Sequence, residues 1–211
     1  MIQIKHLPGA RTQTDANHGR GVWSPPNGYT FTQFTENCRD TLSSDQSAEG
    51  HSEIRRKLEQ LLAEPDFVSE YCGPDAEPGI HTVYHDAETG FQVLVHVYET
   101  GKSGPPHDHG DHAGSWAVYG QAVLHTDMTM WRRIDDGSRD GHAELEPDGA
   151  IRLEPAMAAN VEHDDIHSIR FPDGARFVRV TGTDLDRIPT RRFDPDRQTV
   201  DIGSRLDPLP G

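Results

Sequence analysis

The chain has 211 residues, and its 20 Lys and Arg against 35 Asp and Glu give a formal net charge of −15. Nucleic-acid binding draws most of its affinity from clustered basic side chains, so this balance argues against a nucleic-acid binder. No apolar run reaches the length of about 18 residues that a membrane helix needs, and none near the start has signal-peptide length. We therefore expect a cytoplasmic protein with neither nucleic-acid nor membrane partners.

The N-terminal part divides into an arm and a helical segment. Residues 1–30 are dense in Gly, Pro and Asn and predict a flexible arm. Apolar residues then recur at helical spacing, with Ser52 as the candidate N-cap and Pro65 near the end: Ile54, Leu58, Leu61 and Leu62. A second short helix is expected over residues 67–71. We assign residues 31–75 to this helical segment.

Beyond it, short alternating apolar runs separated by Gly, Pro and Asp turns predict antiparallel strands. The candidate strands are residues 80–84, 91–98, 116–133, 143–145, 151–153, 166–171 and 177–181. The run 116–133 is long enough to bend or divide. Many short strands over about a hundred residues indicate a sandwich or barrel, including the jelly-roll type. We assign residues 76–184 to this β domain and residues 185–211, rich in Asp, Arg and Pro, to an extended tail.

The strongest chemical signal is the pair His107 and His109. Alternate residues of a strand point to the same face, so an HxH pair can offer two imidazoles to one metal ion. An isolated HxH is also common in solvated polar loops. His163 and His167, further along the chain, are the candidates for a third ligand.

Gly101, His107, His109 and Gly120 have the spacing of the first motif of cupin proteins, which the chain resembles here. The motif's Glu is missing, because Ala113 and Gly114 occupy the positions where it would fall. Asp165-Ile166-His167 is similar to the end of the second cupin motif, so the resemblance favours His167 as third ligand, with His163 as backup. It implies a mainly β cupin barrel, a double-stranded β-helix jelly roll, with an N-terminal helical segment.

Cupins with three histidines and Fe(II) include the cysteine dioxygenase and 3-mercaptopropionate dioxygenase group, which the chain resembles over roughly residues 50 to 183. Shared features are the helical segment, the proline before the HxH pair, the Trp116 strand leading into Gly120, and the Asp-Ile-His triplet. Those enzymes use O2 to oxidise an iron-bound thiolate to a sulfinate. Their Ser-His-Tyr relay has no counterpart in residues 177–181, and their cysteine crosslink has none near Gly114.

The resemblance implies an Fe(II) dioxygenase whose partners are O2 and a small metal-chelating substrate, in the first place a thiol carboxylate. Imidazole ligands suit several metals, so Zn, Mn or Ni are alternatives to iron. Two other functions stay open: an O2-independent, metal-dependent cupin isomerase or lyase, and a non-catalytic cupin that binds a metal or ligand. Cupins often dimerise through barrel edges, which makes a homodimer a further expectation.

Further residues are candidates for roles beside the metal. The resemblance places a substrate-binding Arg in the N-terminal part, which Arg55 or Arg56 could supply, although helical salt bridges explain both equally well. Arg132 ends a long strand, where it could hold a carboxylate or merely protect an edge. His125 could hydrogen-bond a ligand or be an ordinary strand residue. Three more aromatic or imidazole groups have weaker cases: His96 and Tyr98 at the barrel mouth, and His112 as a substitute ligand.

Overall fold

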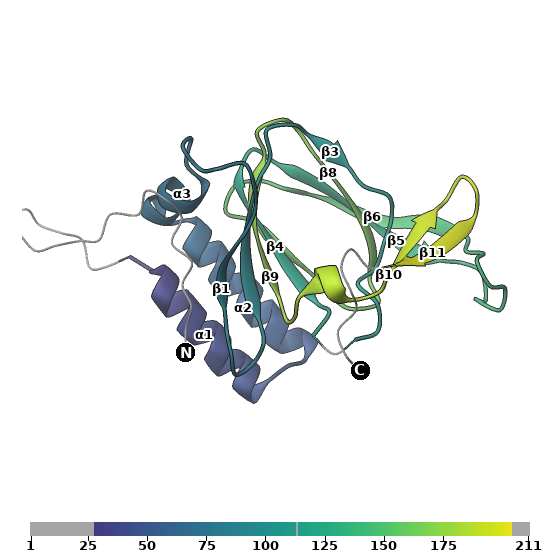
Figure 1. The fold of residues 1–211 in the computed structure, drawn as a ribbon, viewed down its shortest axis with the longest axis horizontal. Coiled ribbons are helices and arrows are strands. Elements are labelled where there is room, and N and C mark those ends of the chain that lie inside the picture. Colours follow the sequence, from purple (N-terminus) through teal and green to yellow (C-terminus); the bar gives the residue numbers. More distant parts are fainter. Residues whose placement is uncertain (1–27, 113, 204–211) are drawn as a thin grey trace, which may run out of the picture.

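The computed structural model describes residues 28–112 and 114–203 (Figure 1). The predicted arm therefore lies outside the described residues, apart from its last three positions. Three helices open the described chain: α1 Phe31–Ser44, α2 Ala48–Leu62 and α3 Pro65–Cys72. The predicted helical segment and its second short helix, α3, are confirmed. Of these three helices, none has the length and apolarity to cross a membrane.

The helix boundaries correct the sequence prediction in two places. The sequence analysis did not predict α1 as a separate helix, although Thr30 and Gln33 form a capping box at its start. The Thr30 hydroxyl accepts a hydrogen bond from the Gln33 N–H at 3.2 Å. α2 begins before the predicted Ser52, because the Ser47 hydroxyl accepts from the Glu49 N–H and so caps the helix one turn earlier.

The strands form two main antiparallel sheets and a hairpin. They are β1 Gly79–His85, β2 Gln92–Val97, β3 Lys102–Ser103, β4 Ala117–Val123, β5 Thr126–Arg133, β6 Leu145–Leu153, β7 Ala158–Val161, β8 Ile166–Phe171, β9 Arg176–Thr181, β10 Thr190–Asp194 and β11 Thr199–Gly203. One sheet has the order β1-β2-β9-β4-β7 and the other β3-β8-β5-β6, while β10 pairs with β11. This strand order confirms the prediction of a mainly β jelly-roll barrel with N-terminal helices.

Several strand predictions need correction. The run 116–133 does divide, as its length allowed, and it does so where Leu124 takes a positive φ of 61° between β4 and β5. Leu145 and residues 151–153, predicted in two separate strands, lie in the single strand β6, and residues 143–144 precede it. The Pro-Asp-Gly sequence at residues 147–149 does not end the strand, because a bulge opposite Met130 and Trp131 absorbs it. β3 and β7 were not predicted. In place of an extended tail, residues 185–203 hold a short 3-10 helix, Leu185–Arg187, and the β10–β11 hairpin.

The five-stranded sheet is apolar on both faces. Its outer face packs under the helices, so Val93, Val118 and Val178 share one core with Phe34 and Leu58 (Figure 1). Its inner face contributes to a second core inside the barrel, which contains side chains of both main sheets: Ala117, Tyr119, Met128, Leu153, Phe171 and Phe177. Strand alternation thus sends neighbouring residues of β4 and β9 to the helices and to the barrel interior in turn.

Candidate metal centre

His107, His109 and His167 come together inside the barrel. Each offers a ring nitrogen, and the three nitrogens lie within 4.8 Å of one another. His107 and His109 lie in the extended segment between β3 and β4, and His167 is the second residue of β8. Two backbone hydrogen bonds of 2.9 Å, from each N–H to the other's carbonyl, join His107 to His167. The facing strand therefore delivers its imidazole to the HxH pair, as the sequence predicted.

Hydrogen bonds fix which ring nitrogen each histidine presents. The Nδ1 of His107 lies 3.2 Å from the Pro105 carbonyl, and the Nδ1 of His109 lies 3.0 Å from the Ser115 carbonyl. The Nδ1 of His167 lies 3.4 Å from the Asp165 carbonyl. Since a carbonyl only accepts, each Nδ1 carries the proton, and the three Nε2 lone pairs are left for a ligand.

The side chains of His107, His109 and His167 are uncharged at neutral pH. Burial lowers the pKa of His109 to about 3, with the neighbouring charge of His107 acting in the same direction. Burial likewise lowers the pKa of His107, and it lowers the pKa of His167 well below its ordinary value. Three uncharged imidazoles at neutral pH are the form that binds a transition metal.

The donor set fits a transition-metal ion. The Nε2 of His167 is fully buried and has no hydrogen-bond partner among the described residues, which is costly for an acceptor unless something occupies its lone pair. Three imidazole nitrogens suit Fe, Zn, Cu and Ni better than Mg or Ca, which prefer oxygen. The same three residues would hold the ion, and no carboxylate belongs to the group.

A buried ion pair holds the HxH segment in place. The Asp108 side chain points away from its two histidine neighbours and is 0% exposed. Its Oδ2 accepts from Arg191 Nε at 2.6 Å, and its Oδ1 accepts from the Arg191 and Gly110 N–H groups at 3.2 and 3.0 Å. Arg191 lies on β10, so the C-terminal hairpin fixes the strand that carries two ligands.

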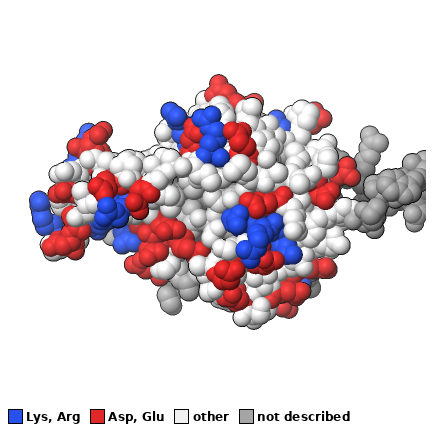
Figure 2. Space-filling view, turned by 180° about the vertical axis from the view of Figure 1, so that it is seen from behind, with Lys and Arg blue, Asp and Glu red and all other residues white. Residues whose placement is uncertain are grey.

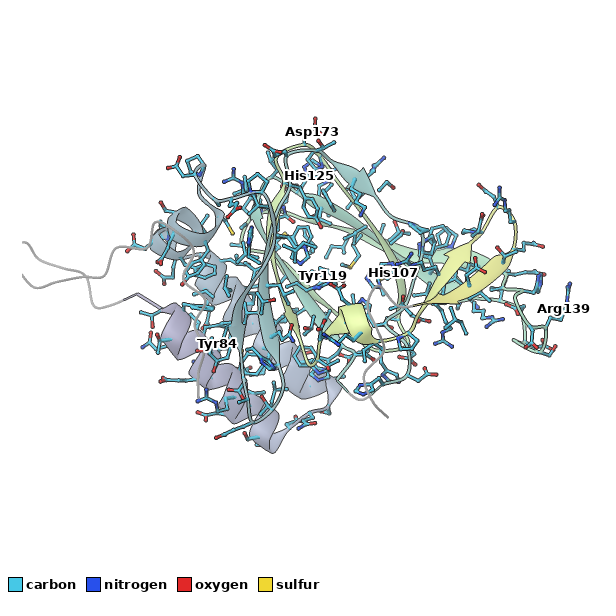
Figure 3. All side chains as sticks on the ribbon, viewed as in Figure 1. Tyr84, His107, Tyr119, His125, Arg139 and Asp173 are labelled. Atoms are coloured by element: carbon cyan, nitrogen blue, oxygen red, sulfur yellow. The ribbon has the colours of Figure 1, made fainter. Side chains whose placement is uncertain are left out.

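His107 and His109 line a cavity of about 350 Å³. Its wall is built mainly of aromatic, aliphatic and basic side chains and includes Ile80, His96, Tyr98, Lys102, Gly104, Pro105, His107, His109, Tyr119, Ile169, Phe171, Phe177, Arg179, Leu185, Asp186, Ile188, Thr190 and Arg192. Tyr119 and His107, both labelled in Figure 3, belong to this wall. The Tyr119 hydroxyl lies 3.4 Å from the Nε2 of His109 and can donate to it. His96 and Tyr98, weighed from the sequence as mouth residues, belong to this wall.

Three candidates from the sequence do not line the cavity. Arg55 lies on α2 and pairs with Glu59 at 2.9 Å, and Arg132 is 59% exposed and pairs with Glu146. His125 lies in the turn between β4 and β5, in a separate surface hollow beside Asp127, near the end of the barrel that carries Asp173 in Figure 3. A local salt bridge or turn position explains each of the three. The structure thus does not support a catalytic role for them.

The two alternative ligands, His163 and His112, lie outside the group of three histidines. The His163 side chain is 54% exposed, with its Nδ1 3.9 Å from an Asp164 carboxylate oxygen. His112 is exposed in the loop after the HxH pair, and neither residue belongs to the histidine group. The residues that the sequence analysis missed are Tyr119, Arg179 and Arg192 together with the 185–190 segment of the wall. Strand alternation alone could not single them out, because both faces of β4 and β9 are buried.

No protein-family model and no curated protein matches the sequence. Similar solved structures include a cupin superfamily protein from Desulfitobacterium hafniense, with 16% identity over 54% of this chain and 86% of that chain and a TM-score of 0.36. KdgF from Halomonas sp. has 20% identity over 53% and 88%, with a TM-score of 0.35. Oxalate oxidase in complex with the substrate analogue glycolate has 12% identity over 44% and 42%, with a TM-score of 0.31.

Likeness at this level carries no argument about activity. The pairing of the strands shows the architecture: a mainly β protein with antiparallel sheets in a jelly-roll barrel, and three helices before it. A three-histidine group inside the barrel could bind a metal ion.

Proposed function

We propose that the protein is a mononuclear Fe(II) dioxygenase that oxidises a small thiol carboxylate to its sulfinate. The observation that carries the proposal is the group of three uncharged histidines with no carboxylate among them, of which His107 and His109 line the cavity. Three uncharged ligands leave the full charge of a dication in place, which favours an anionic, chelating substrate such as a thiolate.

An Fe(II) ion held by His107, His109 and His167 would supply open coordination positions for the substrate and for O2. The chain's own residues would do the rest. The apolar side chains Phe171, Phe177 and Ile188 exclude water from the cavity. If the Nε2 lone pair of His109 binds the metal ion, the Tyr119 hydroxyl is free of that hydrogen bond and would donate to a substrate atom instead. This hydrogen bond would orient the substrate beside the histidines.

Oxygen uptake by anaerobically Fe(II)-loaded protein tests this proposal directly, with 3-mercaptopropionate and cysteine as substrates. We expect uptake that needs iron and a product that mass spectrometry shows to be two oxygen atoms heavier. His167→Ala should abolish uptake and stoichiometric iron binding together. His163→Ala is the matched control, since that exposed side chain lies outside the histidine group.

If the protein holds one Fe(II) per chain and consumes no O2 with either thiol, the dioxygenase assignment fails. Turnover of a substrate without O2 would favour a redox-neutral metal enzyme instead. A homodimer stays a prediction, to be checked by the mass of the protein in solution.

A further inference from the structure

Arg179 is a cation placed inside the barrel. It lies in the middle of β9, which is the central strand of the five-stranded sheet and pairs with both β2 and β4. Its neighbours Val178 and Val180 belong to the core under the helices, so alternation sends Arg179 to the same inner face as Phe177. There it lines the cavity beside the histidines.

The Nε of Arg179 is buried and makes no hydrogen bond within the described residues. No ion pair joins this arginine to a described carboxylate. Arg179 is half-buried, and a partly desolvated charge without a counter-ion is costly in a folded protein, so such a group indicates an anion that is bound from outside.

The charge of the cavity wall supports this. Lys102 and Arg192 also line the cavity, so its wall holds three cationic side chains and the single carboxylate of Asp186. The whole chain has the opposite balance, at −15. On the face in Figure 2, Lys and Arg lie in small groups bordered by Asp and Glu, as expected for solvated surface pairs. The cavity is therefore a local attractor for small anions within an acidic protein.

The rest of the wall limits the kind of anion. Apart from the histidines and the charged groups, it is dominated by aromatic and branched aliphatic side chains, including Tyr98, Phe171, Phe177, Ile169 and Ile188. A volume of about 350 Å³ suits a small molecule. One half-buried guanidinium in dry surroundings matches a single negative charge, and its planar fork matches a carboxylate.

We propose that Arg179 binds the carboxylate of a small monoanionic substrate whose apolar body lies against Phe171 and Phe177. This deepens the proposed function, since it names the residue that selects the substrate in the same cavity. It places the substrate-binding arginine on β9, in the last third of the chain, and not on α2 where Arg55 lies. Arg179 would hold the substrate in position and take no part in bond making.

Binding, measured without turnover, tests the proposal. The probes are benzoate and 3-methylbutanoate, each paired with its neutral amide, and titration calorimetry on the full chain is run both as purified and after chelator treatment. We expect each carboxylate to bind at least about tenfold more tightly than its amide, in line with a charge-assisted hydrogen-bonded pair. Arg179→Met should abolish this preference in both preparations. Arg197→Met, at an arginine that is 82% exposed, is the control that should retain it.

A second readout separates binding from a structural role. Because Arg179→Met removes a half-buried charge that forms no ion pair with a described carboxylate, its thermal midpoint should equal or exceed that of the parent protein, whereas a structural arginine would lower it. Arg179→Lys keeps the charge but loses the fork, so its preference should be intermediate.

Equal binding of carboxylate and amide by the parent protein, or an unchanged preference in Arg179→Met, would overturn the proposal. So would tighter binding of inorganic phosphate than of either carboxylate. Because none of these measurements uses O2, a protein that binds carboxylates through Arg179 but consumes no oxygen would refute the dioxygenase and leave the carboxylate site standing.

Discussion

A β-carbon added at Gly120 would lie 2.6 Å from Cδ2 of Leu58, so the absence of a side chain on β4 allows α2 to rest directly on the sheet. We expect Gly120→Ala to destabilise the protein by about 1–3 kcal/mol through overpacking. Leu58→Ala, which leaves a cavity at a fully buried site, should cost about 2–5 kcal/mol. Urea unfolding measures both.

The double variant Gly120→Ala/Leu58→Ala tests whether the two positions meet as described. Since the new methyl group would enter space that the leucine vacates, the double variant should be less destabilised than the sum of the single variants, by at least about 0.5 kcal/mol. Strict additivity would show that the added methyl group is resisted by Leu62, whose Cδ1 would lie 2.5 Å from the same β-carbon, and not by Leu58.

His167 and His163 differ only in placement, which makes them a matched pair for metal binding. His167 is 0% exposed and points into the histidine group, whereas His163 lies on the surface. We expect His167→Ala to lower the stoichiometry of bound Zn(II) or Fe(II) to near zero in equilibrium dialysis, and His163→Ala to leave it at one per chain. The reverse result would make His163 the third ligand.

The ion pair between Asp108 and Arg191 should influence metal affinity although neither residue belongs to the histidine group. Without Arg191 the HxH segment loses its anchor on β10, so Arg191→Met should weaken Zn(II) binding by about tenfold in competition with a chromophoric chelator. Arg197→Met, on the same hairpin, removes an exposed arginine and serves as control. Identical affinities would show that the segment holds its shape unaided.

Asp86 gives the fold an acid-sensitive contact. Burial alone would raise the pKa of this carboxyl, but hydrogen bonds from Thr89, Arg39 and Tyr84 outweigh burial and hold the pKa well below its usual range. A depressed folded-state pKa means that the stabilisation is present above the unfolded pKa of about 3.9 and is lost as the pH falls below it.

The stability gap between the parent protein and Asp86→Asn should therefore be largest at pH 7 and narrow between about pH 4 and pH 3. Urea unfolding at several pH values measures it. A gap that stays constant down to pH 3 would show that the Asp86 contacts do not depend on its charge.

The sequence was sufficient to predict that His107, His109 and His167 come together, because the relevant rules are local. The period of two in a strand places His107 and His109 on one face, and the triplet ending in His167 precedes a recognisable strand. The sequence could not single out Arg179 as a cavity residue, because β9 is buried on both faces and its side chains point alternately to the helices and to the barrel interior. Which face is the interior depends on where the helices pack, and that is decided by the whole fold.

The C-terminal hairpin illustrates the same limit. Its composition of Asp, Arg and Pro gives no apolar period, and a single buried residue, Phe193, anchors β10. What holds it is distant: the Phe193 N–H donates to the Pro106 carbonyl, and Arg191 pairs with Asp108. Arg55 was implied by the resemblance, and Arg132 and His125 were selected by residue type and strand position. The structure gives each of the three a local salt bridge or turn position away from the cavity.

The backbone pairing of His107 with His167 also has a consequence for folding kinetics. The two residues are sixty positions apart, so they meet only after a long loop has closed, which is slow and entropically unfavourable. A complete ligand set therefore exists late on the folding route. An ion that binds it should leave the refolding rate unchanged and slow unfolding, so that the metal lengthens the lifetime of the native protein without hastening its formation.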